Sequence, residues 1–245
     1  MQPTSLQQLL AFISSPQNNF GAETWATLKL SIVPILLAIV ISVPLGIVLA
    51  QRPVAAFLAT NASGLVRAIP TLAVLAALAE TPFLGIGFRP SVFALFLLGI
   101  PPILLNTITG LRGIDPATVD AARGMGMTRW QILSRVRLPL MAPVLAAGVR
   151  TSAVQIVATV PIAALIGGGG YGDYILLGLD LFQLTPLLVG GIGIAVLALL
   201  TELLLGQAQR ALTPTGLRIA AASDEGAAGM RGAATDAAGS ASLAA

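Results

Sequence analysis

The 245-residue chain contains no cysteine and no histidine. It therefore cannot form disulfides, offer a thiolate nucleophile, or use an imidazole as a metal ligand or general base. Charged residues make up only 9% of the sequence, against roughly a quarter in a soluble domain. So few charges cannot cover a water-facing surface, and 56% of the residues are hydrophobic. The composition indicates an integral membrane protein for which we expect no catalytic residue, no metal and no cofactor.

Basic residues give the chain a net charge of +3, which in a soluble protein would favour a nucleic-acid partner. Here they lie beside apolar runs, where the positive-inside bias explains them, so we exclude nucleic acid. The first 23 residues contain no Lys or Arg and no long apolar stretch. We therefore expect no cleavable signal peptide.

Long apolar runs predict an all-α polytopic membrane protein with five transmembrane helices. The expected spans are residues 30–50, 65–84, 91–111, 140–166 and 184–205, within a transmembrane domain of residues 28–210. Residues 1–27 are expected to form an extracytoplasmic segment. Residues 211–245 are rich in Ala, Gly, Ser and Thr without a periodic apolar face, which predicts a disordered cytoplasmic tail.

The start of the second span is ambiguous. The polar run Asn61-Ala62-Ser63-Gly64 is typical of a break, which would place Arg67 at the membrane edge. If the helix instead runs unbroken from Val54, Arg67 lies deep in the bilayer and becomes a functional candidate. We expect the edge position and leave the deep one open.

Basic residues near the ends of the spans fall mostly on one side, which predicts the orientation. The side with few basic residues holds Lys29 and Arg89. With five spans the N-terminus is expected outside and the C-terminus in the cytoplasm. The side that carries most of the charge, and is therefore cytoplasmic, holds Arg52, Arg112, Arg123, Arg129, Arg135, Arg137, Arg210, Arg218 and Arg231.

The long polar loop 112–139 carries local helix signals. Asp115-Pro116 is a good helix start, and residues 117–123 are expected to be helical. Gly124 and Gly126 permit a sharp turn. Thr128 and Gln131 have the spacing of a capping box for a second helix over 129–137, which we expect to end at Leu138-Pro139. The loop is thus predicted to be helix, glycine turn, helix.

Seven residues of this loop have a fixed spacing: Asp120, Ala121, Ala122, Gly126, Val136, Leu138 and Pro139. With them the loop resembles the E-A-A-x3-G-x9-I-x-L-P signature of bacterial ABC importer permeases. Two positions differ conservatively, Asp for Glu and Val for Ile, and that family often has Pro where Arg129 stands. The resemblance implies a bacterial cytoplasmic membrane protein with an ABC importer permease fold of the methionine-importer type and a cytoplasmic coupling helix that docks on an ATPase. An amphipathic helix lying on anionic headgroups is the alternative.

Shorter segments resemble one branch of that family, the permeases for glycine betaine, carnitine and choline. They are residues 69–73, 84–87, 106–107, 138–140, 147–151 and 166–172. The resemblance implies two cytoplasmic ATPase subunits, a second permease copy or a sister permease, and an extracytoplasmic substrate-binding protein. It implies transport of a small osmoprotectant, with lipid as the surrounding partner. An ABC permease for an amino acid such as methionine is the alternative.

The candidate site residues fall into two groups. The first is expected to couple to the ATPase: Asp120, Ala121, Ala122, Arg123, Gly124, Gly126, Thr128 and Arg129. The second is expected to line the pathway: Pro70, Thr71, Asn106, Thr159 and Pro161. Pro161 is expected to interrupt the fourth span, since a broken helix is tolerated where it lines a cavity. For Asn106, hydrogen bonding to a neighbouring helix is the competing role.

Other residues suggest alternative functions, which their sequence context does not favour. The glycine run 167–172 lacks the Lys-Ser/Thr of a phosphate-binding loop and is expected to be an outer turn. An ion-driven secondary transporter usually needs intramembrane carboxylates, whereas Glu80 and Glu202 are expected to be solvated near span ends. A membrane enzyme would lack catalytic groups. Trp25 and Trp130 lie outside the spans, no aromatic cage for a quaternary ammonium ion can be assembled, and recognition is expected on the binding protein.

Overall fold

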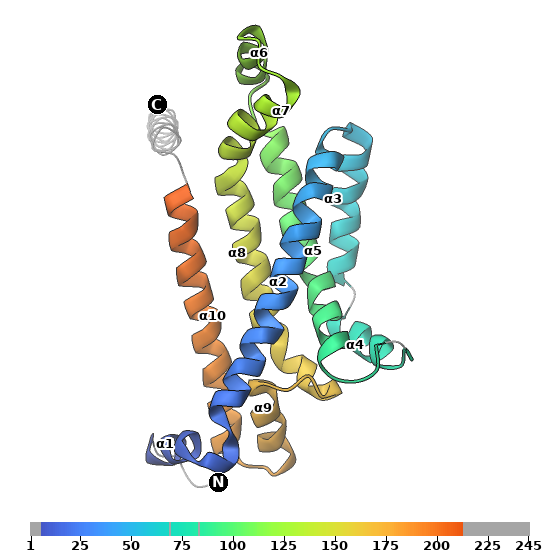
Figure 1. Ribbon diagram of the computed structural model, residues 1–245. Helices are drawn as coiled ribbons and strands as arrows, with labels where there is room; N and C mark the ends of the chain where they lie inside the picture. The colour runs from blue at the N-terminus through green and yellow to red at the C-terminus, as the bar shows by residue number, and fades with distance from the viewer. Residues whose placement is uncertain (1–5, 69, 83, 213–245) are drawn as a thin grey trace, which may run out of the picture.

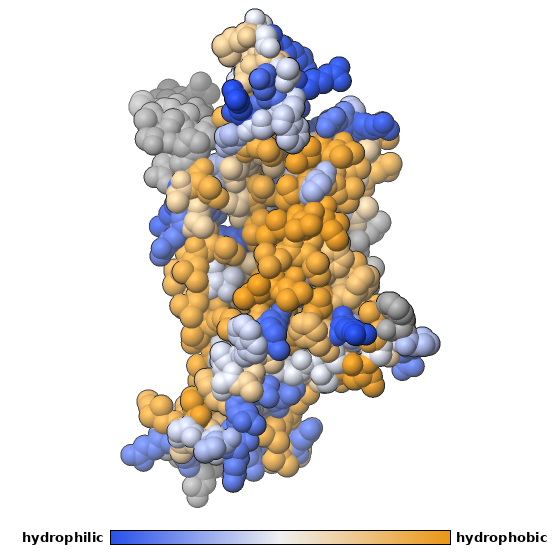
Figure 2. Space-filling model, in the orientation of Figure 1, coloured by the Kyte–Doolittle hydropathy of each residue, from blue (hydrophilic) through white to orange (hydrophobic). Residues whose placement is uncertain are grey.

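The computed structural model describes residues 6–68, 70–82 and 84–212, and for residues 65–68 only the backbone. Throughout this part of the chain every regular element is a helix (Figure 1). Four helices are long and apolar enough to cross a membrane: Pro16–Ala50, Phe88–Arg112, Arg129–Ile166 and Leu184–Leu212. Figure 2 shows an apolar band around the middle of the molecule and hydrophilic residues gathered towards its two ends.

The helices follow one another with short connections. In chain order they are α1 (Leu6–Ser14), η1 (Pro16–Asn18), α2 (Phe20–Ala50), α3 (Pro53–Ala68), α4 (Thr71–Ala79), α5 (Phe88–Arg112), α6 (Pro116–Gly124), α7 (Arg129–Gln131), the π-helical turn η2 (Ile132–Arg137), α8 (Leu138–Ala163), η3 (Ala164–Ile166), α9 (Tyr171–Asp180) and α10 (Leu184–Leu212).

Helix α5 packs against both α2 and α8 and forms the centre of the bundle. Leu30, Leu95 and Ile156, one from each helix, are fully buried together. Gly99 on α5 allows the close approach, because a Cβ there would lie 2.8 Å from Ile156 Cδ1. Ser152 uses that proximity to donate a hydrogen bond to the Gly99 carbonyl at 2.9 Å. Helix α10 packs against α8 and α9 at the side of this core.

The expected second span, residues 65–84, is not a single helix. Helix α3 continues through Asn61-Ala62-Ser63-Gly64, where the sequence predicts a break, and ends at Ala68. Asn61 Nδ2 donates to Phe57 O and Ser63 Oγ donates to Ala59 O, both at 2.8 Å, so these polar side chains are satisfied within the helix. The break falls at Pro70, which begins the turn into α4 and disfavours helical geometry in the preceding residue.

The backbone of Arg67 lies in the last turn of α3, and its side chain lies outside the described residues. Helix α3 has 16 residues and rises about 24 Å, which is less than the thickness of a bilayer core. Figure 1 shows α3 and α4 together returning the chain towards the end of the molecule at which α5 begins.

Pro161 and Pro139 are expected to interrupt or end helices, but both lie within continuous helical runs. Pro161 lies inside α8, which continues to Ala163 and then tightens into η3. The second helix of the polar loop does not end at Leu138-Pro139, because α7, η2 and α8 form one continuous run from Arg129. Pro139 has no N–H to donate to the preceding turn, and the helix widens into a π-helical turn just before it.

The ends of the spans also differ from expectation. Helix α2 begins at Phe20, so most of the expected extracytoplasmic segment 1–27 that the structure describes is helical, in α1, η1 and the start of α2. Helix α10 extends to Leu212, and the rest of the expected tail lies outside the described residues. Figure 1 shows α6 and α7 at one end of the bundle, with α1 and α9 at the other.

Candidate functional site

The polar loop begins with the cap that the sequence predicts. Asp115 Oδ1 accepts a hydrogen bond from the Ala117 backbone N–H at 2.9 Å, and Pro116 occupies the first helical position of α6. A carboxylate here satisfies a backbone donor that the helix leaves unpaired and is favoured by the positive end of the helix dipole. The start of α6 is therefore fixed locally.

Helix α6 ends in a Schellman turn around Gly126. The Gly126 N–H donates to Arg123 O at 2.9 Å, and the Met127 N–H donates to Ala122 O at 3.2 Å. Gly126 has φ +79°, in the left-handed region, and a Cβ there would have no atom within 4 Å. Glycine is therefore required at Gly126 for its backbone conformation and not for lack of space. Gly124, which the sequence also placed in the turn, is the last residue of α6.

A capping box opens the second helix, as the sequence predicts. Thr128 Oγ1 accepts from the Gln131 N–H at 3.3 Å, and Gln131 Oε1 accepts from the Thr128 N–H at 2.8 Å. These reciprocal bonds satisfy two backbone donors at the start of α7. Both turns of the loop are thus determined by residues within it.

A small apolar core holds α6 against η2. Val119, Ala122 and Ile132 are buried, with exposed fractions of 5%, 2% and 5%. Met127 packs against the same cluster, which supplies the apolar contact that usually accompanies a Schellman turn. Ala122, one of the expected coupling residues, therefore lies inside the loop, where only a small side chain fits between the two helices.

One face of α6 is exposed and consists of small residues. Ala117, Ala121 and Gly124 follow one another at positions i, i+4 and i+7, which share a helix face. Asp120 and Arg123 flank this face and form an ion pair at 3.0 Å between side chains that are 67% and 65% exposed. An exposed pair contributes little to stability. We call Ala117, Ala121 and Gly124 the small-residue face of α6.

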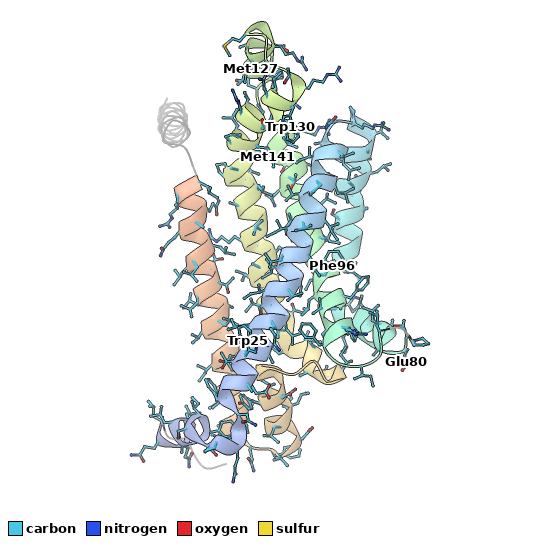
Figure 3. All side chains as sticks on the ribbon, in the orientation of Figure 1. Trp25, Glu80, Phe96, Met127, Trp130 and Met141 are labelled. Atoms are coloured by element: carbon cyan, nitrogen blue, oxygen red, sulfur yellow. The ribbon has the colours of Figure 1, made fainter. Side chains whose placement is uncertain are left out.

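The adjacent side of α6, which includes Asp120 and Arg123, borders a cavity of about 760 Å³. The cavity lies between the polar loop and the ends of α2 and α5, since Ala50 and Arg112 both line it. Trp130 also lines it and is 71% exposed. Figure 3 shows Trp130 and Met127 near the end of the molecule opposite to Trp25. We call this space the loop cavity.

The expected pathway residues come from three helices, α4, α5 and α8. Neither the loop cavity nor an apolar cavity between α1, α2, α9 and α10 is lined by any of them. Pro70 and Thr71 begin α4, whereas Thr159 and Pro161 lie near the end of α8. Asn106 donates to Pro102 O of its own helix at 2.8 Å. Among the described residues, the side chain of Asn106 therefore bonds within its own helix. The hydrogen bond to a neighbouring helix, which was its competing role, does not form there.

Sequence reasoning missed an aromatic cluster at the end of the bundle that carries α1 and α9. Phe20 stacks on Tyr171 with ring centroids 5.5 Å apart, and Phe12 meets the edge of Tyr174 at 5.4 Å. The two tyrosines are almost fully buried. The rings pack against one another. The aromatic spacing alone could not reveal this, because the four residues come from three helices.

The glycine run 167–172 is held against α2 by hydrogen bonds. Glu23 Oε2 accepts from the Gly170 N–H at 2.7 Å, and Thr27 Oγ1 accepts from the Tyr171 N–H at 2.9 Å. Partial desolvation raises the pKa of the Asp173 carboxyl above its ordinary value, and Glu23 raises it further. The run is a turn at the N-terminus of α9, as expected, but it is tightly attached.

A second contact missed by the sequence joins α8 to α10. Arg150 Nη2 donates to Glu202 Oε1, and Arg150 Nη1 donates to Gln209 Oε1 at 3.3 Å. The expectation that Glu202 is simply solvated is therefore wrong. The signal was present in the sequence as one cation and one carboxylate within apolar helices, but only the packing of α8 on α10 pairs them.

Known proteins resemble the chain along most of its length. Residues 42–214 match the family described as the binding-protein-dependent transport system inner membrane component. The carnitine transport permease protein OpuCB of Listeria monocytogenes is 38% identical, with 87% of this chain and 97% of that protein covered. The glycine betaine/carnitine/choline transport system permease protein OpuCB of Bacillus subtilis is 34% identical with the same coverage.

Solved structures share the fold. The MetNI methionine ABC transporter, in an inward-facing crystal form, gives a TM-score of 0.68 at 23% identity and covers 80% of this chain and 96% of that chain. An amino acid ABC transporter solved with histidines gives a TM-score of 0.62 at 19% identity, over 85% of this chain and 99% of that chain. At such identities the likeness concerns the fold alone.

Proposed function

The chain belongs to the family of inner membrane components of binding-protein-dependent transport systems, and from this premise we propose that it forms the translocation pathway for osmoprotectants such as glycine betaine, choline or carnitine. The observation that carries the substrate class is the identity of 34% to 38% with carnitine, choline and glycine betaine permeases over most of the chain. The chain is a multi-pass plasma membrane protein and a permease subunit of an ABC importer. ATP hydrolysis takes place on a separate subunit.

Five crossings place the N-terminus outside and the C-terminus in the cytoplasm. The four long helices supply four of them, and α3 with α4 supplies the remaining one as a broken span. Breaks of this kind are tolerated in a membrane where neighbouring helices surround them, and both α3 and α4 pack against α5. Under this topology the polar loop and the end of α10 share the cytoplasmic side.

The small-residue face of α6 is the surface that meets the ATPase. Ala117, Ala121 and Gly124 carry no side chain larger than a methyl group, so the backbone of α6 can lie close in a groove of the partner. Asp120 and Arg123 at its edge can exchange their mutual ion pair for bonds to the partner. Gly126 and the Thr128 capping box fix the angle at which α6 is presented, Ala122 supports it from behind, and Arg129 lies at the start of the helix that leads to α8.

The pathway forms between two permease subunits, either two copies of this chain or this chain and a sister subunit. Pro70, Thr71, Asn106, Thr159 and Pro161 are the residues proposed to line it. An extracytoplasmic binding protein delivers the substrate at the outer end, near residues 167–182. Closure of the ATPase pair on ATP draws the two α6 helices together and turns the pathway from inward-facing to outward-facing.

Uptake into proteoliposomes that contain the complete complex and its binding protein tests the proposal. Glycine betaine, choline, carnitine and methionine are compared as labelled substrates and as competitors. We expect ATP-dependent uptake of at least one of the first three and no competition by methionine. Uptake of methionine without any of the others would assign the chain to the amino-acid branch.

A further inference from the structure

Four arginines line the loop cavity at the cytoplasmic end of the bundle. They are Arg112, Arg123, Arg129 and Arg137, and the one carboxylate that lines the cavity with them is Asp120. Asp120 forms its ion pair with Arg123. Within the part of the chain that the structure describes, no carboxylate lies within 4.0 Å of the other three guanidinium groups. The cavity therefore carries an uncompensated positive charge.

Arg137 gives a second and independent sign of a missing ligand. Its Nε atom is buried and has no hydrogen-bond partner among the described residues. A buried donor without a partner costs free energy, and each one in a folded protein calls for an acceptor. A phosphate oxygen is a suitable acceptor, since a guanidinium presents donors in a fork that matches phosphate geometry.

The walls and the position of the cavity favour a lipid as the source of the phosphate. Its lining includes Leu111, Ile114 and Leu133 beside the arginines, so a basic patch and an apolar surface share one space. Ala50 and Arg112, which also line it, are the last residues of α2 and α5. The cavity therefore opens at the level where headgroups begin. Trp130 lies at its edge, and tryptophan is enriched at this depth.

The small-residue face of α6 does not itself line the cavity. Ala117, Ala121 and Gly124 are absent from the lining, whereas Pro116, Val119 and the flanking residues Asp120 and Arg123 belong to it. We propose that the loop cavity binds the phosphate of an anionic phospholipid of the cytoplasmic leaflet, with Arg112, Arg129 and Arg137 as its ligands. The bound lipid fills the space between the polar loop and the spans and holds α6 at a fixed distance from the membrane.

Fluorescence of Trp130 tests this directly. The chain has 2 tryptophans, so the variant Trp25→Phe leaves Trp130 as its single emitter. The full-length chain is placed in nanodiscs of one fixed mixture of phosphatidylglycerol and phosphatidylcholine, in which either the anionic or the zwitterionic lipid carries a bromine quencher. We expect brominated phosphatidylglycerol to quench Trp130 more strongly than its share of the mixture accounts for.

The variants Arg112→Gln and Arg137→Gln should each reduce this preference about fivefold. Arg135→Gln is the matched control, because Arg135 lies in the same π-helical turn, carries the same charge and does not line the cavity. Its preference should equal that of the parent. Arg137→Lys keeps the charge but lacks the Nε donor and the guanidinium fork, so its preference should lie between those of the parent and Arg137→Gln. A preference equal to the parent's would contradict the role given to Arg137 Nε.

Four results would overturn the proposal. Equal quenching by the two brominated lipids would show that no anionic lipid is selected, and an equal loss in Arg135→Gln would show attraction by bulk charge alone. A response of Trp130 to inorganic phosphate as large as the response to phosphatidylglycerol would assign the cavity to a soluble anion. Loss of the preference when the ATPase subunits are added would show that a protein carboxylate occupies the cavity in the complex.

Discussion

Arg150 on α8 and Glu202 on α10 form an ion pair between two membrane-spanning helices. Gln209 Oε1 accepts a hydrogen bond from Arg150, and Gln209 Nε2 donates one to Pro143 O at 3.4 Å. Replacing one partner leaves the other charge beside apolar surface, whereas replacing both removes the requirement for a partner. This polar contact is thus expected to fix how α10 sits on α8.

A double-mutant cycle measures that contact. Arg150→Gln and Glu202→Gln should each lower the thermal unfolding midpoint of the chain in detergent, and the double variant should be less destabilised than the sum of the two. The control is Thr201→Ala, which removes a hydroxyl next to Glu202 that bonds only within its own helix. Additive effects of the two glutamine substitutions would mean that the pair contributes no coupling.

Gly126 offers a test of the loop that separates backbone conformation from contact. Gly126→Val should cost roughly 1 to 2 kcal/mol because a β-branched residue is placed at φ +79°. Substrate-stimulated ATP hydrolysis and transport should fall together, while insertion in the membrane is unchanged. Gly126→Asn is the comparison, since Asn tolerates this conformation, and it should keep most of the activity. If both variants transport at the parental rate, the Schellman turn has no role in coupling.

The glycine run contains its own matched pair. Gly169 and Gly170 both have positive φ, at +82° and +87°, but a Cβ on Gly170 would lie 2.7 Å from Thr27 Oγ1 and one on Gly169 would approach nothing closer than 3.9 Å. Gly170→Ala should therefore lower stability by about 1 to 3 kcal/mol more than Gly169→Ala, as overpacking does. Thermal unfolding of the two variants in the same detergent gives the comparison, and equal midpoints would contradict the close approach of α9 to α2.

The raised pKa of the Asp173 carboxyl predicts that the stability of the fold depends on pH. Its pKa is raised in the folded chain, so the folded state binds a proton more tightly than the unfolded state. Stability should therefore fall as the pH rises from the ordinary value of 3.8 through the raised pKa. Asp173→Asn should raise the unfolding midpoint above that window and leave it unchanged below it. A variant that is stabilised equally at every pH would show that the titration of Asp173 is not the cause.

The sequence predicts features that depend on neighbouring residues. The Asp115 cap, the Gly126 turn and the Thr128 capping box all occur where they are expected, because each needs only residues a few positions apart. Four of the apolar runs appear as long helices for the same reason, since hydrophobicity over about 20 residues suffices to predict them.

What the sequence could not provide depends on packing. Asn61 and Ser63 look like a break, but they bond to carbonyls of their own helix, and nearby Ala56 is buried against α5. The sequence also carries a signal for a break at Pro70, where the break does occur. Neighbouring residues alone do not show at which of the two positions the helix ends. The Arg150–Glu202 pair and the aromatic cluster also join residues far apart in the chain, so no spacing in the sequence brings them together.

Crosslinking from the small-residue face tests the central claim, that α6 couples this permease to its ATPase. The chain has no cysteine, so Ala121→Cys gives a single site on that face, and Val54→Cys gives a control in the first turn of α3 that is 72% exposed. In the complete complex, a short bifunctional reagent should join Cys-substituted Ala121 to an ATPase subunit and leave the Val54 variant unjoined. Equal crosslinking of both, or none from Ala121 in a complex that still transports, would contradict the account.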